Sequence, residues 1–228
     1  MKTIFALLLS LAAIHSASAA ILFTSEAAGL QQTTLSDTLT ESFNLLPAGA
    51  LGAYNSTIGQ YSQGAIISDP NAWGGANQTR YIAVGAQSNT TSYTLDFAND
   101  LTYFGLNWQA DDAKNELRFY NNGLLVQAFN TDTVFAALSA AYNGNPNNGQ
   151  NQGEKYAFFN FYATEGTTFN QVMFYNDGAS TGFETDNHTI LKPSDPISAT
   201  EETQTPEPAT MALVGAAIIA IGYKRRRR

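Results

Sequence analysis

The 228-residue chain contains no cysteine and only two histidines. Without thiols it can form neither a disulfide nor a Cys-His catalytic pair. His15 lies in the apolar N-terminal stretch, so His188 is the one imidazole left in the rest of the chain. A zinc site needs several imidazole or thiolate ligands. The sequence therefore gives no support for zinc or for histidine-based nucleophilic catalysis, and we expect His188 to be a surface or strand-edge residue.

Positive charge is also scarce over most of the chain. Residues 21–205 contain five Lys and Arg against eighteen Asp and Glu, so this part has a net charge of −13. Such a surface repels the phosphate backbone, which argues against a nucleic-acid partner. Divalent cations, neutral sugars or basic proteins fit this charge better.

The N-terminal residues have the pattern of a secretory signal. Lys2 is followed by the apolar residues 4–14 and then by Ala17-Ser18-Ala19, a small-residue cleavage pattern. We predict a signal peptide over residues 1–20, cleaved after Ala19 or Ala20.

The C-terminal residues combine an apolar run with a basic end. Residues 209–223 carry no charge, and residues 224–228 are all Lys or Arg. As a helix the run is about 22 Å long, against a hydrocarbon core of about 30 Å. We predict a short transmembrane helix that holds the chain in the membrane transiently, with the cations in the cytoplasm and the body outside.

Three residues before this run complete a recognisable order. Pro206, Glu207 and Pro208, then the apolar span and the Arg-rich end, resemble the PEP-CTERM sorting signal of Gram-negative bacteria. The resemblance implies an exosortase as partner and removal of the tail at residues 206–228. It also implies an inner-membrane intermediate and then the cell surface or extracellular matrix of a polysaccharide-producing host. Residues 192–205 are rich in Pro, Ser, Thr and acids, and we expect a flexible linker there.

Residues 21–191 read as an all-β body. Short runs rich in aromatic and β-branched residues alternate with Asn, Gly and Asp clusters. Residues 115–130 predict a hairpin around Asn122-Gly123, and residues 131–142 predict one short helix with Thr131 and Asp132 as candidate caps. We predict an antiparallel, jelly-roll-like β-sandwich. The expected core is Leu95, Phe97, Phe104, Leu106, Leu117, Phe119, Phe159, Phe161 and Phe174.

The body also resembles a family of exosortase-dependent surface proteins. The segments that carry this resemblance are "SFNLLPAG", "GGANQTRYIAVG", "TYFGLNWQADDAKNELRFYNNG" and the closing "FETDN". The resemblance implies surface display and leaves the biochemical activity open.

Two groups of residues are candidates for binding. Glu184 and Asp186 lie two apart, so on a strand they share one face; with Asn187, and Glu41 from the opening strand, they could bind calcium at an acidic sheet edge. Trp73, in the loop-like "DPNAWGGANQ", suits sugar stacking or a cap at one end of the sandwich. Trp108 is expected in the core.

These observations favour a non-enzymatic, exported surface or matrix protein associated with exopolysaccharide. A secreted carbohydrate-active enzyme using a carboxylate pair is one alternative, and a dedicated carbohydrate- or ice-binding module is another. No catalytic residue is assigned.

The tail gives the first testable prediction. Replacing Pro206, Glu207 and Pro208 together, or deleting the exosortase of the host, should leave an uncleaved membrane-bound form, because the sorting enzyme no longer recognises the chain. Fractionation and immunoblotting detect that form. Unchanged maturation in both strains would contradict the prediction.

Overall fold

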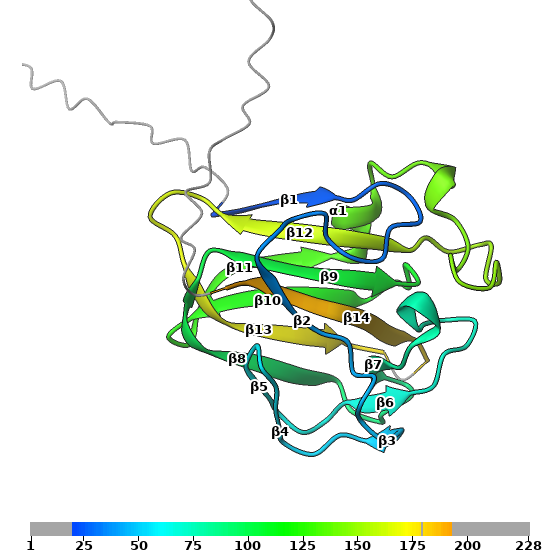
Figure 1. The fold of residues 1–228 in the computed structure, drawn as a ribbon, viewed down its shortest axis with the longest axis horizontal. Coiled ribbons are helices and arrows are strands. Elements are labelled where there is room, and N and C mark those ends of the chain that lie inside the picture. The colour runs from blue at the N-terminus through cyan, green and yellow to red at the C-terminus, as the bar shows by residue number, and fades with distance from the viewer. Residues whose placement is uncertain (1–19, 179, 193–228) are drawn as a thin grey trace, which may run out of the picture. The chain divides into compact units, whose positions relative to one another are not determined.

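The computed structural model describes residues 20–178 and 180–192, and nearly all regular structure there is β-strand (Figure 1). The chain divides into two units, residues 1–196 and 197–228, and the described residues all belong to the first. In this part no helix is long and apolar enough to cross a bilayer. The predicted linker and sorting tail lie outside the described residues except for Lys192, and the predicted signal peptide except for Ala20.

The strands form two sheets in which every pairing is antiparallel. The larger sheet contains β1 (Ile21–Ser25), β2 (Thr38–Glu41), β3 (Gly49–Ala50), β6 (Ile66–Ser68), β7 (Tyr81–Gly85), β9 (Tyr103–Gln109), β12 (Ala157–Ala163) and β14 (Gly182–Leu191). The smaller sheet contains β4 (Tyr54–Asn55), β5 (Gln60–Tyr61), β8 (Ser92–Leu101), β10 (Asn115–Asn121), β11 (Leu124–Asn130) and β13 (Phe169–Asn176). Their orders are β1-β12-β9-β14-β7-β6-β3, with β2 on β14, and β11-β10-β13-β8-β5-β4. The predicted all-β antiparallel class is confirmed, and the jelly-roll-like connection stays a prediction.

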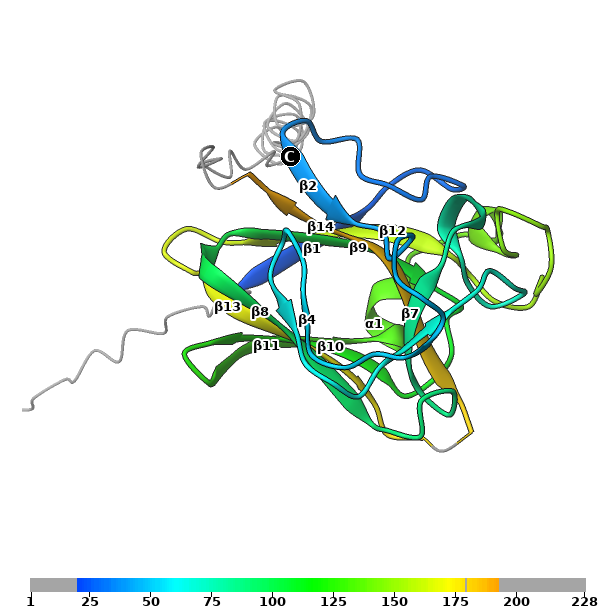
Figure 2. The same cartoon turned by 60° about the horizontal axis from the view of Figure 1, so that its bottom comes forward.

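The two sheets lie one above the other, and their facing side chains form the core (Figure 2). Aromatic rings dominate it; Phe119, for example, lies 5.3 Å from Phe161 and 4.9 Å from Phe169 between ring centroids. Eight of the nine predicted core residues are buried. Phe97 is the exception: it is only partly buried and packs against the margin of the core.

Hairpin and helix follow local rules. Asn122 and Gly123 have φ of 48° and 79°, as a tight turn between β10 and β11 requires, so the predicted hairpin is confirmed. The helix is shorter than predicted: α1 spans Thr131–Phe135, and a separate 3-10 turn spans Ala140–Tyr142. The N-cap of α1 is Asn130 rather than the predicted Thr131 or Asp132. The side chain of Asn130 accepts a hydrogen bond from the N–H of Thr133.

The last strand, β14, is interior, although its sequence suggested an acidic sheet edge. It pairs with β9 on one side and with β7 and β2 on the other, and all ten of its residues are buried. Loops cover its outer face: the N–H of Ala76 bonds to Asp186, and the side chain of Asn187 bonds to the carbonyl of Gln31. The edge position predicted for Glu184 and Asp186 is therefore wrong.

A bulge in β14 explains a second wrong prediction. Asp186 pairs with Asn107 and Thr189 with Gly105, so β14 has one extra residue, and Asn187 adopts φ of 49° there.

The extra residue turns His188 into the core, where it is fully buried rather than at the surface. Its Nδ1 lies 2.9 Å from the hydroxyl of Tyr61, and its Nε2 lies 2.9 Å from that of Thr185. The ring also stacks on Phe174 at 4.7 Å.

Truncating a central ring tests this core. Phe161→Ala removes a fully buried ring and should lower the free energy of unfolding by about 3–5 kcal/mol. Urea unfolding followed by fluorescence measures the loss, and Leu124→Ala, at a site 75% exposed, is the matched control. A small, equal effect in both variants would show that the ring is not in a packed core.

Candidate functional site

Trp73 is the exposed tryptophan of the described part. Its side chain is 52% exposed, whereas Trp108 is buried as predicted. It lies in residues 69–80, here the Trp73 loop. The side chain of Asn71 accepts hydrogen bonds from the N–H of Trp73 at 2.8 Å and of Gly74 at 3.2 Å. This local turn fixes the backbone that carries the indole.

A second loop supports the first from the side. Residues 143–152, here the Asn145 loop, lie at the same end of the molecule (Figure 1, turquoise and light green). Asn145 donates to the carbonyls of Asn71 and Ala72 at 3.1 and 3.3 Å, and Asn148 donates to Asn71 at 3.0 Å. The hydroxyl of Tyr156 donates to Ala72 at 2.8 Å. The side chains of Asn145, Asn148 and Tyr156 therefore hold Asn71 and Ala72, the two residues before Trp73.

The face of the larger sheet that points away from the core also supports the Trp73 loop. Asp186 accepts hydrogen bonds from the N–H of Ala76 at 2.8 Å and the hydroxyl of Thr79 at 3.2 Å. Gln109 accepts the N–H of Gly75 at 2.9 Å. Gly75 has φ of 104°, and a Cβ there would lie 2.6 Å from the carbonyl oxygen of Thr79, so glycine is required. The loop is thus ordered before any ligand arrives, which reduces the entropy cost of binding.

A groove of about 330 Å³ lies beside the Trp73 loop. Its walls come from residues 28–29 and from residues 141–156, and no charged side chain lines it. Its exposed amide groups belong to Asn143 and Gln152, whereas Asn145 and Tyr156 are buried and bond to the Trp73 loop. Because Asn145 and Tyr156 also bond to the Trp73 loop, the groove and that loop are adjacent.

The two carboxylates of β14 are buried without a cation. Glu184 is 1% exposed and Asp186 0%, and neither forms an ion pair within the described residues. Glu184 accepts a hydrogen bond from Gln87, and its other oxygen has no described partner. Burial raises the pKa of Glu184 to about 8 and that of Asp186 to about 8, although hydrogen bonds oppose the shift in both. Asp186 therefore acts as a buried anchor of the Trp73 loop.

The predicted calcium ligands are only partly brought together. Glu184 and Asp186 share a face of β14, but Asn187 donates its amide to the carbonyl of Gln31. Glu41 accepts hydrogen bonds from the N–H of Phe43 and from the hydroxyl groups of Tyr54 and Ser56. In the part of the chain that the structure describes, no group of three or more His, Cys, Asp or Glu side chains could hold a metal ion. Calcium binding stays a prediction.

The residues that support Trp73 were missed from the sequence. Gln109 ends the aromatic-rich strand β9, and Tyr156 precedes the aromatic-rich strand β12. Asn145 belongs to "NGNPNNGQNQGE", which reads as a polar loop. The density of asparagine was the one available signal, because asparagine side chains readily bond to backbone groups.

The comparisons with known proteins identify the C-terminal segment. Residues 204–228 match the family model of the PEP-CTERM protein-sorting motif, which confirms the resemblance noted from Pro206, Glu207 and Pro208. The motif implies export and exosortase-dependent sorting to the cell surface in Gram-negative bacteria. No curated protein and no solved structure matches the chain. The resemblance of the body to exosortase-dependent surface proteins stays a prediction.

The buried acids predict a pH dependence. Their folded pKa of about 8 exceeds the ordinary 4.5 of Glu184 and 3.8 of Asp186. As pH rises, the unfolded chain loses these protons first, so the free energy of unfolding should fall until both groups have ionised near pH 8. Burial lowers the pKa of His188 from 6.5 to about 3. Below pH 6.5 the unfolded chain therefore binds a proton that the folded chain does not, and there His188 makes the free energy of unfolding rise with pH.

Urea unfolding between pH 6.5 and 8 tests this dependence. The double change Glu184→Gln with Asp186→Asn should flatten the fall, because neither new side chain titrates. Asp132→Asn, at an exposed site, should leave it unchanged. The same slope in the double variant and the parent would refute the assignment.

Proposed function

We propose that this chain is an exported, non-enzymatic surface or matrix protein whose body binds neutral extracellular polysaccharide. Its C-terminal motif delivers it through exosortase sorting. The observation that carries the binding role is Trp73, a half-exposed indole on a loop held by Asn145, Tyr156, Gln109 and Asp186.

The chemistry of this region suits a sugar. An indole presents a flat apolar face, against which the apolar face of a sugar ring packs. The neighbouring groove offers the exposed amide groups of Asn143 and Gln152, which can bond to sugar hydroxyls.

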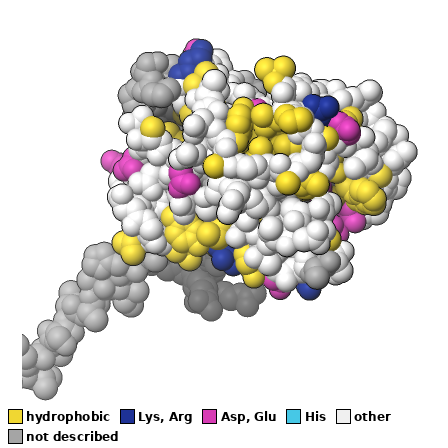
Figure 3. All heavy atoms as spheres, turned by 90° about the horizontal axis from the view of Figure 1, so that it is seen from below, with side chains coloured by type: hydrophobic (Ala, Val, Ile, Leu, Met, Phe, Trp, Pro, Cys, Tyr) yellow, Lys and Arg dark blue, Asp and Glu magenta, His cyan; other side chains and the backbone are white. Residues whose placement is uncertain are grey.

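Charge supports a neutral polymer over an anionic one. No charged side chain lines the groove, and the net charge of −13 over residues 21–205 repels polyanions. Figure 3, which shows the molecule from below, has few charged side chains on that face, and hydrophobic side chains form several patches there.

The burial of the acids supports a non-enzymatic role. A glycosidase needs two carboxyl groups that face its substrate across a cleft. Glu184 and Asp186 are buried under loops, and no carboxylate lines the groove. The carbohydrate-active enzyme remains the alternative that the experiment below tests.

The test uses the mature exported protein on immobilised neutral polysaccharides. Trp73→Ala should weaken retention at least tenfold, about 1.4 kcal/mol, because the stacking surface is removed. Trp73→Phe should retain most of the binding. Leu45→Ala, at a site 98% exposed, is the matched control for losing a surface apolar group.

Two results would contradict the proposal. Equal retention of Trp73→Ala and the parent would exclude the Trp73 loop as the binding site. New reducing ends released from the polysaccharide would select the enzyme instead.

A further inference from the structure

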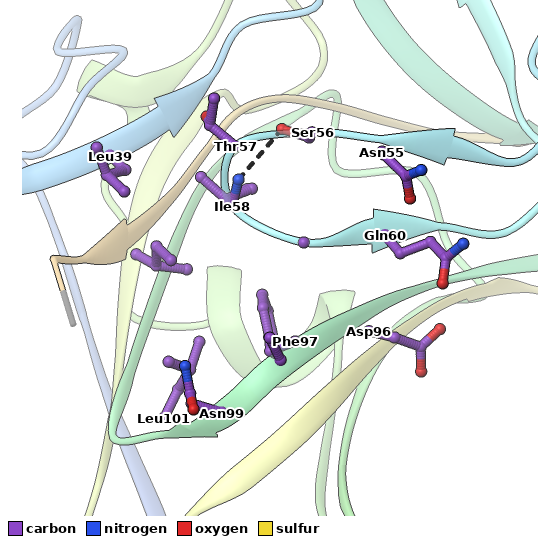
Figure 4. A pocket seen from close by; sticks show the side chains of 13 residues that line it. Leu39, Asn55, Ser56, Thr57, Ile58, Gln60, Asp96, Phe97, Asn99 and Leu101 are labelled. Atoms are coloured by element: carbon purple, nitrogen blue, oxygen red, sulfur yellow. Dashed lines mark hydrogen bonds between the residues drawn. The ribbon is translucent and has the colours of Figure 1, made fainter.

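A second hollow, of about 410 Å³, opens between the two sheets (Figure 4). β2 and β14 form one side of this inter-sheet hollow; β8 and the turn between β4 and β5 form the other. The hollow exists because β5 is short. It pairs with β8 only at Asp96 and Leu95, whereas β8 continues to Leu101. The second half of β8 therefore has no β5 residue beside it, and Phe97 is left partly buried at the opening.

The inside of the hollow is apolar. Phe97 points from β8 toward the turn that carries Ile58, whereas Asp96 and Gln60 point away (Figure 4). The apolar lining consists of Leu39, Ile58, Phe97, Ala98, Leu101 and Ile190. Phe97 also touches the core through Phe104 and Phe169, at 6.0 and 6.2 Å between ring centroids, so its ring is held in place.

The rim carries polar groups that the protein itself does not use. Asn55, Thr57 and Asn99 are exposed, and Figure 4 draws no hydrogen bond to the side chain of any of them. The hydrogen bond drawn there runs from the N–H of Ile58 to the hydroxyl of Ser56. These amide and hydroxyl groups are free to bond to a ligand.

The hollow has one charged side chain in its lining. No Lys or Arg lines it, and its one carboxylate, Asp96, already accepts hydrogen bonds from Thr94 at 3.1 Å and Gln171 at 2.6 Å. A ligand that matches this surface is uncharged, has an apolar face and carries hydroxyl groups at its edge. A neutral sugar ring has these properties.

We propose that the inter-sheet hollow is a second glycan site, so that one protein binds two segments of neutral polysaccharide and bridges them. The inference rests on the proposed function, since it takes the same class of ligand. The sites lie apart along β14: Asp186 holds the Trp73 loop, and Ile190, four residues later, lines the hollow. At about 3.3 Å per residue this separation is about 13 Å along the strand.

Two sites on a rigid body have a consequence that one site lacks. When a polymer offers many equivalent segments, binding at the first site raises the local concentration of segments at the second. The protein then retains polymer more strongly than a short oligosaccharide, and it can connect two chains.

The test counts sites on the mature exported protein. The probe is a short oligosaccharide cut from a neutral polysaccharide that the protein retains, titrated by calorimetry. The parent should bind two per protein. Asn55→Ala with Asn99→Ala changes only exposed rim residues, and it should weaken one of the two sites at least tenfold. Leu124→Ala is the exposed control and should keep both sites.

Polymer bridging provides the second measurement. The parent should raise the turbidity of a solution of the polysaccharide, because it connects chains. The rim variant and Trp73→Ala should each bind polymer without raising turbidity, and the combined variant should bind none. Phe97→Leu should act like the rim variant, with its folding checked by thermal melting.

The outcomes separate the two proposals. One oligosaccharide per parent protein whose binding Trp73→Ala weakens and the rim variant leaves intact, or two per rim variant, overturns the second site and leaves the Trp73 site standing. Loss of all binding in the rim variant, with Trp73→Ala unaffected, supports the hollow and overturns the Trp73 site. Binding of a fatty acid or an extended peptide in the hollow, with no oligosaccharide there, also overturns the inference.

Discussion

The hydrogen bond from the N–H of Ala76 to the carboxyl group of Asp186 joins the centre of the larger sheet to the loop that presents Trp73. Asp186 occupies a fully buried position of the sheet, where side chains are usually apolar. Burying an acid without a cation is costly, and the cost is limited because Asn187, Ala76 and Thr79 all donate to it. The loop geometry and the stability of the sheet therefore depend on the same carboxyl group.

The same constraint explains why polar residues accumulate on one side of β14 and β9. Asn107 and Gln109 of β9 lie opposite Asp186 and Glu184 of β14, and all four are buried. Gln109, Asp186 and Glu184 accept hydrogen bonds from the covering loops, whereas the side chain of Asn107 has no hydrogen-bond partner among the described residues. The opposite side of the two strands packs on aromatic rings. The larger sheet thus has an apolar face toward the core and, at β9 and β14, a polar face that the loops cover. Its outer face is open to solvent at β1, where Leu22 is 51% exposed.

The sequence predicted those features of the structure that depend on neighbouring residues, and it failed for those that depend on contacts with distant parts of the chain. The hairpin around Asn122-Gly123 and the core position of Trp108 follow from short-range patterns, and the structure agrees with both. The interior position of β14 does not follow, because "GFETDNHTIL" has the composition of a solvated edge strand. Only the loops that cover it, from distant parts of the chain, make that composition compatible with burial. His188 was misplaced for a related reason, since one extra residue at Asn187 exchanges the two faces of a strand.

The position of β14 also bears on when the protein can fold. It is the last strand in the sequence, yet it pairs with β2, β7 and β9 in the middle of the larger sheet. Until Gly182–Leu191 has emerged, β7 and β9 have no strand between them, and the core lacks one wall. Contacts so distant in sequence form late and favour slow folding. A chain synthesised or translocated from its N-terminus would therefore remain without its central strand until almost the whole body had passed, a property that suits export in an unfolded state.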